Sequence, residues 1–170
     1  NNINWIGNGL TIPSGPLRES LDCLKKYKHI FINGNLENSE TIEKELLNIN
    51  PKIKIHFGKY IPLNLKEFDL KKKYIIFSGI GNHQTFVSML KINGFNVIKD
   101  IEFPDHYQYS QSDLNEMIHI SEKNDYEIIT TEKDFFRLEN LKSAKINFIK
   151  SKLKIINEEK LVNDIMNLNE

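Results

Sequence analysis

The segment Phe103-Pro104-Asp105-His106-Tyr107 carries the side chains best suited to moving a proton. It places an acidic residue next to a histidine, on a loop that is restricted by proline and that follows a run typical of a strand. A histidine titrates near neutral pH and can therefore act as a general base. This pattern predicts His106 as such a base, although an ordinary loop histidine would show the same local sequence. The histidines that lack this combination of neighbours are His29, His56, His83 and His119.

A second candidate lies near the start of the chain, between Gly7 and Glu19. Its three glycines and two prolines let the backbone approach a ligand closely while fixing the shape of the loop. The Arg18 guanidinium can bind phosphate oxygens in a forked geometry, and the Glu19 carboxylate can bind a metal ion or its waters. The same residues also fit an exposed loop with a solvated ion pair at a helix start.

Two further segments stand where helices are expected to begin after strands. Ser78-Gly79-Ile80-Gly81-Asn82 lacks the third glycine of a dinucleotide-binding fingerprint, so a tight turn with Asn82 as helix N-cap also explains it. Thr131-Glu132-Lys133-Asp134 fits a capping box. Capping leaves Lys133 unexplained, because the helix dipole disfavours a cation in the first turn. Both segments therefore remain candidates for ligand contact at the carboxyl ends of strands.

Several sequence motifs of known sites are missing from the chain. Gly58-Lys59 is followed by Tyr60 and has Ile53 where the first glycine of a P-loop would stand, so this chain holds no P-loop. No sequence cluster of histidine and cysteine suggests zinc, and no G-x-S-x-G motif suggests a serine hydrolase.

The elements that must position these segments alternate along the chain. Short apolar runs predict strands at 29–32, 52–61, 74–77, 96–101, 127–129 and 146–149. Helical spacing of apolar residues predicts helices at 41–47, 110–121, 131–138 and 158–168, and one more between Asn82 and Gly94. This alternation predicts a three-layer, Rossmann-like α/β fold, in which helices flank a mainly parallel sheet. The order of the strands stays open.

The predicted domain boundary lies near Pro51. The first fifty residues hold few apolar positions, so residues 1–50 are predicted to be the end of a domain that starts upstream. Residues 51–170 are predicted to form a C-terminal α/β domain. The chain does not begin with Met and shows no signal peptide, which agrees with a missing upstream part.

Composition narrows the class of protein. Hydrophobic residues make up 39% and charged residues 27% of the 170 residues, which is typical of a folded soluble core. Basic and acidic residues both number 23, so net charge does not favour nucleic acid as a partner. A single cysteine excludes an intrachain disulfide, and no stretch approaches the roughly 20 apolar residues of a membrane span.

Taken in order, these segments resemble the tetraacyldisaccharide 4'-kinase family. That family shows G-N-G followed by P-A-G-P-L-R-E, then a strand ending Asn-Gly, then G-I-G-N-P, F-P-D-H-H and T-E-K-D. The matching residues here are Gly7 to Gly9 with Pro13 to Glu19, Asn33-Gly34, Gly79 to Asn82, Phe103 to His106, and Thr131 to Asp134. Each motif alone is weak, but five in the same order are a specific signal.

The chain departs from the family pattern at three positions. Ser14 replaces an alanine, His83 replaces the proline after Gly-Ile-Gly-Asn, and Tyr107 replaces the second histidine of the F-P-D-H-H motif. The last change leaves His106 as the only histidine of its loop. The resemblance therefore assigns the family's catalytic histidine to His106.

The resemblance implies transfer of the γ-phosphoryl group of ATP, with Mg²⁺, to the 4'-hydroxyl of tetraacyldisaccharide 1-phosphate in lipid A biosynthesis. It implies that His106 pairs with an upstream aspartate and takes the hydroxyl proton, while Arg18 steadies phosphate charge. Glu19 would hold Mg²⁺ directly or through water, and Asp105 would orient its neighbour or the loop. The positions that the resemblance places in contact with nucleotide or glycolipid are Asn8, Arg18, Gly81, Asn82, Thr131, Glu132, Lys133 and Asp134.

The same resemblance implies a P-loop domain upstream of residue 1, which would carry the other metal-binding carboxylates. Residues 1–170 alone are therefore expected to be inactive. The parent would work at the cytoplasmic face of the inner membrane of a Gram-negative bacterium, and no nucleic acid is expected as a partner. Two rival interpretations are a module that binds glycolipid or nucleotide without chemistry of its own, and an unrelated small α/β phosphatase or transferase.

Overall fold

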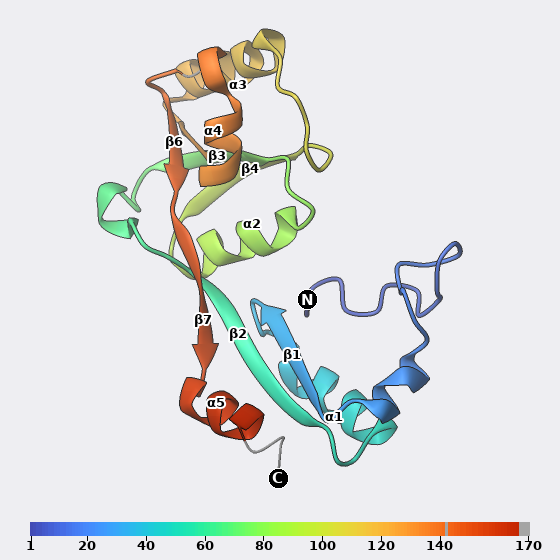
Figure 1. Ribbon diagram of the computed structural model, residues 1–170. Helices are drawn as coiled ribbons and strands as arrows, with labels where there is room; N and C mark the ends of the chain where they lie inside the picture. The colour runs from blue at the N-terminus through green and yellow to red at the C-terminus, as the bar shows by residue number, and fades with distance from the viewer. Residues whose placement is uncertain (142, 167–170) are drawn as a thin grey trace. The chain divides into compact units, whose positions relative to one another are not determined.

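The computed structural model describes residues 1–141 and 143–166 (Figure 1). The chain divides into two compact units. One is formed by residues 1–60 together with the segment from Leu153, and the other by residues 61–152. Each unit has its own sheet, and the functional candidates are distributed between them.

The unit of residues 61–152 is built around a four-stranded sheet with the order β4-β3-β5-β6. All three strand pairs of this sheet are parallel. Its elements are the 3-10 turn η2 (Leu65–Glu67), β3 (Lys73–Ser78), α2 (His83–Ile92), β4 (Asn96–Glu102), α3 (Gln111–Asn124), β5 (Glu127–Thr131), α4 (Glu132–Arg137), the 3-10 turn η3 (Glu139–Leu141) and β6 (Ile146–Ile149).

Helices cover both faces of this sheet: α2 lies on one face, and α3 and α4 lie on the other (Figure 1). The central strand β3 is buried from Tyr74 to Ser78, as expected for a strand covered on both sides. Phe77 of β3 and Ile128 of β5 pack with Leu114 and Met117 of α3 in one core cluster. The predicted mainly parallel sheet flanked by helices is confirmed.

The unit that contains both ends of the chain has a three-stranded sheet with the order β1-β2-β7, in which β1 and β2 are parallel. Its core cluster consists of Ile32, Ile42, Leu46 and Ile53. Its elements are the 3-10 helix η1 (Leu21–Lys26), β1 (His29–Gly34), α1 (Ser39–Ile49), β2 (Lys54–Pro62), β7 (Ser151–Ile156) and α5 (Glu158–Met166), with the ends of β2 and β7 extending into the other unit.

The observed division differs from the boundary expected near Pro51. The first fifty residues do not stand apart, because Ile42 and Leu46 share their core cluster with Ile53, just before β2. The chain also returns to this unit through β7, a strand that the sequence pattern did not predict. The predicted end of the last helix, at residue 168, lies outside the described residues. None of the helices within the described residues is long and apolar enough to cross a membrane.

Candidate functional site

Three of the predicted segments meet at the carboxyl ends of β3, β4 and β5. The turn from Gly79 to Asn82 follows β3, the loop from Phe103 to His106 follows β4, and Thr131 to Asp134 joins β5 to α4. The loops are joined directly, because the Phe103 amide donates to the Ser78 carbonyl (2.9 Å) and the His106 amide donates to the Gly79 carbonyl (3.1 Å). Loops after the carboxyl ends of parallel strands are where ligands of α/β folds bind.

Asp134 is the polar centre of this arrangement and is completely buried. Its Oδ2 accepts hydrogen bonds from the Gly79 amide (3.2 Å) and from the Thr131 hydroxyl (2.7 Å). Thr131 is the N-cap of α4, as predicted, and its hydroxyl accepts the Asp134 amide at 3.1 Å. The acidic residue of the predicted capping motif thus also ties β5 to the turn after β3.

Arg137 connects all three segments and was not among the predicted site residues. Its Nη1 donates to the Gly79 carbonyl (2.9 Å) and to Asp134 Oδ1 (3.1 Å), and its Nη2 lies 2.9 Å from His106 Nδ1. One helical turn separates Arg137 from Asp134. That i,i+3 spacing of opposite charges is the sequence signal that could have identified Arg137 as part of the site.

His106 is highly exposed, with 72% of its side chain accessible. Its backbone is held in the left-handed region, at φ 63°, by the hydrogen bond to Gly79 and by Asp105 Oδ1, which accepts the His106 amide at 3.0 Å. Such a conformation costs a non-glycine residue of order 1–3 kcal/mol and recurs at functional sites. Asp105 Oδ2 lies 3.7 Å from His106 Nε2, so Asp105 shapes the loop and faces the ring.

The contact with Arg137 fixes the protonation of His106 in this arrangement. A guanidinium has donors only, so Nδ1 of His106 must accept and the ring must carry its proton on Nε2. The ring can then take a second proton only at Nδ1, after Arg137 has moved away. A base role for His106 therefore requires the contact between Arg137 and His106 to break when the acceptor is bound.

The turn after β3 packs closely against the loop after β4, which explains the glycine at position 79. A Cβ at Gly79 would lie only 3.0 Å from the Tyr109 hydroxyl and 3.1 Å from the Pro104 carbonyl oxygen. Burial, and less strongly the neighbouring Asp134 carboxylate, raise the pKa of Tyr109, so its hydroxyl stays neutral. A Cβ at Gly81 would lie 3.4 Å from Asp105 Oδ2, which is an ordinary van der Waals distance, so packing restricts Gly79 more than Gly81.

Asn82 and His83 hold the start of α2. Asn82 is its N-cap, as predicted, and its Oδ1 accepts the Thr85 hydroxyl at 2.9 Å. His83, which stands where the family has proline, is buried with Nδ1 2.7 Å from Ser78 Oγ and Nε2 3.5 Å from Asp100. The Ser78–His83 contact holds the turn in place, and because the Ser78 hydroxyl is fully buried it offers no nucleophile to a substrate.

A pocket of about 510 Å³ opens beside this site and is lined by residues 106–109, Arg137, Glu139 and Leu141.

Glu132 is half-buried and Lys133 is exposed on the first turn of α4. Among the described residues Lys133 makes no ion pair. It can therefore present a free ammonium group to an anionic ligand.

Arg18, Glu19 and Asn8 belong to the other unit. Arg18 and Glu19 are exposed, and Glu19 Oε2 lies 3.5 Å from the Tyr27 hydroxyl. The Asn8 side chain is engaged within its loop, since its amide donates to the Ser14 carbonyl (2.8 Å) and its Oδ1 accepts the Leu10 amide (3.1 Å). Asn8 thus shapes the loop that carries Arg18 and Glu19.

Glu19 fits Mg²⁺ only as one ligand among several. Within residues 1–141 and 143–166 it belongs to no group of three close His, Cys, Asp or Glu ligands. Mg²⁺ usually keeps several waters and takes one or two carboxylates with substrate phosphates, so a single exposed carboxylate agrees with its needs. The remaining ligands of such an ion would come from water, nucleotide and other parts of the protein.

Comparison with known proteins assigns the chain to a family. The family model for tetraacyldisaccharide-1-P 4'-kinase matches residues 2–170. The tetraacyldisaccharide 4'-kinase of Pelagibacter ubique (strain HTCC1062) is 54% identical over the whole chain, which covers 54% of that relative. The enzyme of the same name from Rickettsia canadensis (strain McKiel) is 37% identical over 80% of the chain and 40% of its own length.

A crystal structure of LpxK from Aquifex aeolicus, in complex with ATP, has a similar fold. It superposes with a TM-score of 0.51 at 24% sequence identity, over 94% of this chain and 48% of that one. The chain spans about half the length of these curated relatives. The motifs occur in the family's order, and the parallel sheet brings three of them together. Because the family model also matches residues 2–170, this chain belongs to the tetraacyldisaccharide-1-P 4'-kinase family.

Proposed function

We propose that this chain is the C-terminal part of an enzyme that transfers the γ-phosphoryl group of ATP to the 4'-hydroxyl of tetraacyldisaccharide 1-phosphate. The observation that carries the proposal is the family match over residues 2–170. The parent protein would act in lipid A biosynthesis at the cytoplasmic face of the inner membrane of a Gram-negative bacterium. The P-loop would lie in the part of the parent that precedes residue 1.

The site after β3, β4 and β5 would serve the acceptor. In this proposal His106 takes the proton of the 4'-hydroxyl once Arg137 has released Nδ1, and Asp105 keeps the ring in position. Arg137 and Lys133 are the cations of this site, and they would bind phosphate charge. Gly81, Asn82, Thr131, Glu132 and Asp134 would form the frame of the binding site, chiefly by fixing the loops.

The loop of Arg18 and Glu19 would serve the nucleotide. Arg18 would neutralise phosphate charge, which is the main demand of phosphoryl transfer, and Glu19 would supply one oxygen ligand to Mg²⁺. When bound, Mg²⁺ would offset the negative charge that develops on the phosphates. Asn8 would contribute by holding the shape of this loop.

The test is an assay of the purified full-length protein with ATP, Mg²⁺ and the lipid acceptor in detergent. Mass spectrometry of the lipid should show the addition of one phosphate. A folded full-length protein that leaves the acceptor unchanged would refute the proposed reaction. ATP turnover without acceptor would instead favour the rival phosphatase interpretation.

Residues 1–170 alone are expected to give no phosphorylated lipid, because the P-loop that cradles the phosphates is absent from them. The same assay, run with the full-length protein as positive control, measures this. Sustained ATP-dependent turnover by residues 1–170 would show that the chemistry does not depend on an upstream P-loop.

Arg18→Ala and Glu19→Ala in the full-length protein are expected to lower kcat/KM while the free energy of unfolding changes by no more than about 0.5 kcal/mol. Both side chains are exposed and neither supports the core. Asp22→Ala is the matched control, because it removes a nearby exposed ion pair with Lys25 and no ligand contact. A large loss of stability with normal kinetics would mean that Arg18 and Glu19 are structural.

A further inference from the structure

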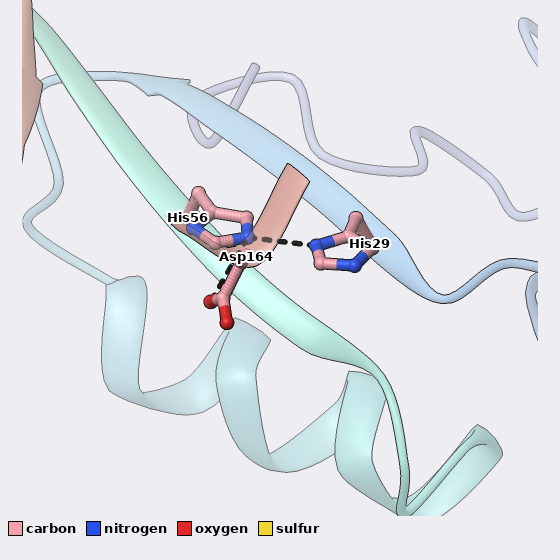
Figure 2. Close-up of side chains that lie close together, drawn as sticks. All are labelled: His29, His56 and Asp164. Atoms are coloured by element: carbon pink, nitrogen blue, oxygen red, sulfur yellow. Dashed lines mark hydrogen bonds and ion pairs between the residues drawn. The ribbon is translucent and has the colours of Figure 1, made fainter. Parts of the chain in front are cut away.

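A group of three polar side chains lies on one face of the β1–β2 sheet, within the unit that contains both chain ends (Figure 2). His29 comes from the start of β1, His56 from β2 and Asp164 from α5. In the parallel register His29 of β1 is paired with Lys54 of β2, and His56 lies two residues after Lys54 in β2. Since side chains alternate along a strand, His29, Lys54 and His56 share one face, and α5 meets that face through Asp164.

The ligand atoms of these residues are directed toward one another. His29 Nδ1 lies 3.0 Å from His56 Nε2, and His56 Nε2 lies 3.9 Å from Asp164 Oδ2. All three atoms lie within 4.8 Å of one another. Zn–N bonds of about 2.0–2.1 Å at tetrahedral angles separate neighbouring ligand atoms by roughly 3.3–3.4 Å. The distances of 3.0 Å and 3.9 Å lie on either side of that value.

His56 is buried, His29 and Asp164 are half-buried, and one carboxylate oxygen of the group lacks a hydrogen-bond partner among the described residues. The His56 side chain is 3% exposed and the Asp164 side chain is 15% exposed. Asp164 Oδ1 is bound by Lys54 at 2.6 Å, but Oδ2 is buried with no hydrogen-bond partner among the described residues. The described protein atoms therefore leave the lone pairs of Asp164 Oδ2 unused.

We propose that His29, His56 and Asp164 form a binding site for a divalent transition-metal ion of the zinc class. Two imidazoles and one carboxylate are ligands that such ions favour, and three protein ligands leave a fourth position for water. Mg²⁺ prefers octahedral oxygen coordination and does not fit this set. The site is independent of the proposed phosphoryl transfer, which uses other residues.

The consequence of binding is mechanical. None of the residues of α5 is buried, so apolar packing contributes little to holding this helix on the sheet. A metal ion bound by β1, β2 and Asp164 would join the last helix to the first strands of the unit, and its binding free energy would stabilise that arrangement. The bound metal ion would therefore hold α5 against β1 and β2.

Isothermal titration of ZnCl₂ into the metal-stripped chain, purified without an affinity tag, tests the proposal. One Zn²⁺ per chain is expected, and MgCl₂ should give no saturable heat. Groups that only hydrogen-bond to metal ligands already contribute roughly 10–100-fold to affinity. His29→Asn, His56→Gln and Asp164→Asn change the ligands themselves, so each should weaken Zn²⁺ binding more than about tenfold. Co²⁺ should give the visible bands of a tetrahedral site in the wild-type chain and lose them in these variants.

Two control variants keep the result specific. His119→Asn changes an exposed histidine in the unit of residues 61–152, which does not contain the proposed metal site. Cys23→Ser removes the only thiol of the chain, which lies in the same unit as the proposed metal site. Both variants should bind Zn²⁺ as the wild type does. Hydrogen exchange of the α5 amides should slow when Zn²⁺ is added, in the wild type but not in Asp164→Asn. Absence of saturable binding, or binding that survives in folded His29→Asn and Asp164→Asn chains, would overturn the proposal.

Discussion

His106→Ala in the full-length protein is expected to lower kcat by roughly 10²–10⁴-fold, the range that a positioned general base contributes. The KM for ATP should change little, because His106 belongs to the acceptor site in the proposed mechanism. The change should leave stability nearly intact, because the ring is largely exposed and its main contact is with Arg137. Steady-state kinetics with lipid acceptor in detergent measure the effect.

Tyr107→His restores the family's usual residue and is the matched control for His106→Ala. The Tyr107 ring packs on Phe103 and Tyr109, and its hydroxyl lies 3.3 Å from Asp113 Oδ2, so it does not share the contacts of His106. Tyr107→His should therefore be nearly neutral for kcat and should not rescue His106→Ala. A wild-type kcat in His106→Ala would show that the loop is structural and that His106 transfers no proton.

Asp134→Ala is expected to lower the free energy of unfolding by about 3–5 kcal/mol, the cost of breaking a buried ion pair by removing one partner. The substitution leaves the Gly79 amide and the Thr131 hydroxyl without their acceptor. It also leaves Arg137, which is only 21% exposed, without its carboxylate. Urea unfolding followed by circular dichroism measures the loss.

Glu116→Ala provides the reference for that measurement. Glu116 is exposed on α3, and an exposed substitution away from special features changes stability by no more than about 0.5 kcal/mol. Asp134→Asn keeps the shape and one acceptor oxygen, so it should fall between the two. If Asp134→Ala cost no more than Glu116→Ala, Asp134 would not be the residue that joins the turn after β3 to α4.

His106→Ala and Asp134→Ala separate two roles within one site. His106 is exposed and lines the pocket, so its removal should affect turnover. Asp134 is completely buried, so its removal should affect folding. Arg137 connects them, with one nitrogen near each.

The amino-acid sequence by itself determined the fold class, most of the strands and helices, and the family. These depend on local patterns: apolar periodicity for β3 and α3, the turn at Gly79 to Asn82, and the Thr131 cap of α4. Motif order then carried the family resemblance, which the match over residues 2–170 confirmed. The functional roles of His106, Arg18 and Glu19 remain predictions.

Only the tertiary structure decided which distant residues meet. The sequence showed no zinc-type cluster and set His29 and His56 aside, because neither has an acidic or histidine neighbour along the chain. The parallel register of β1 and β2 puts the two rings on one face, and the return of the chain through β7 to α5 brings Asp164 to them. Strand order and register follow from the packing of whole elements, so a one-dimensional pattern cannot specify such a juxtaposition.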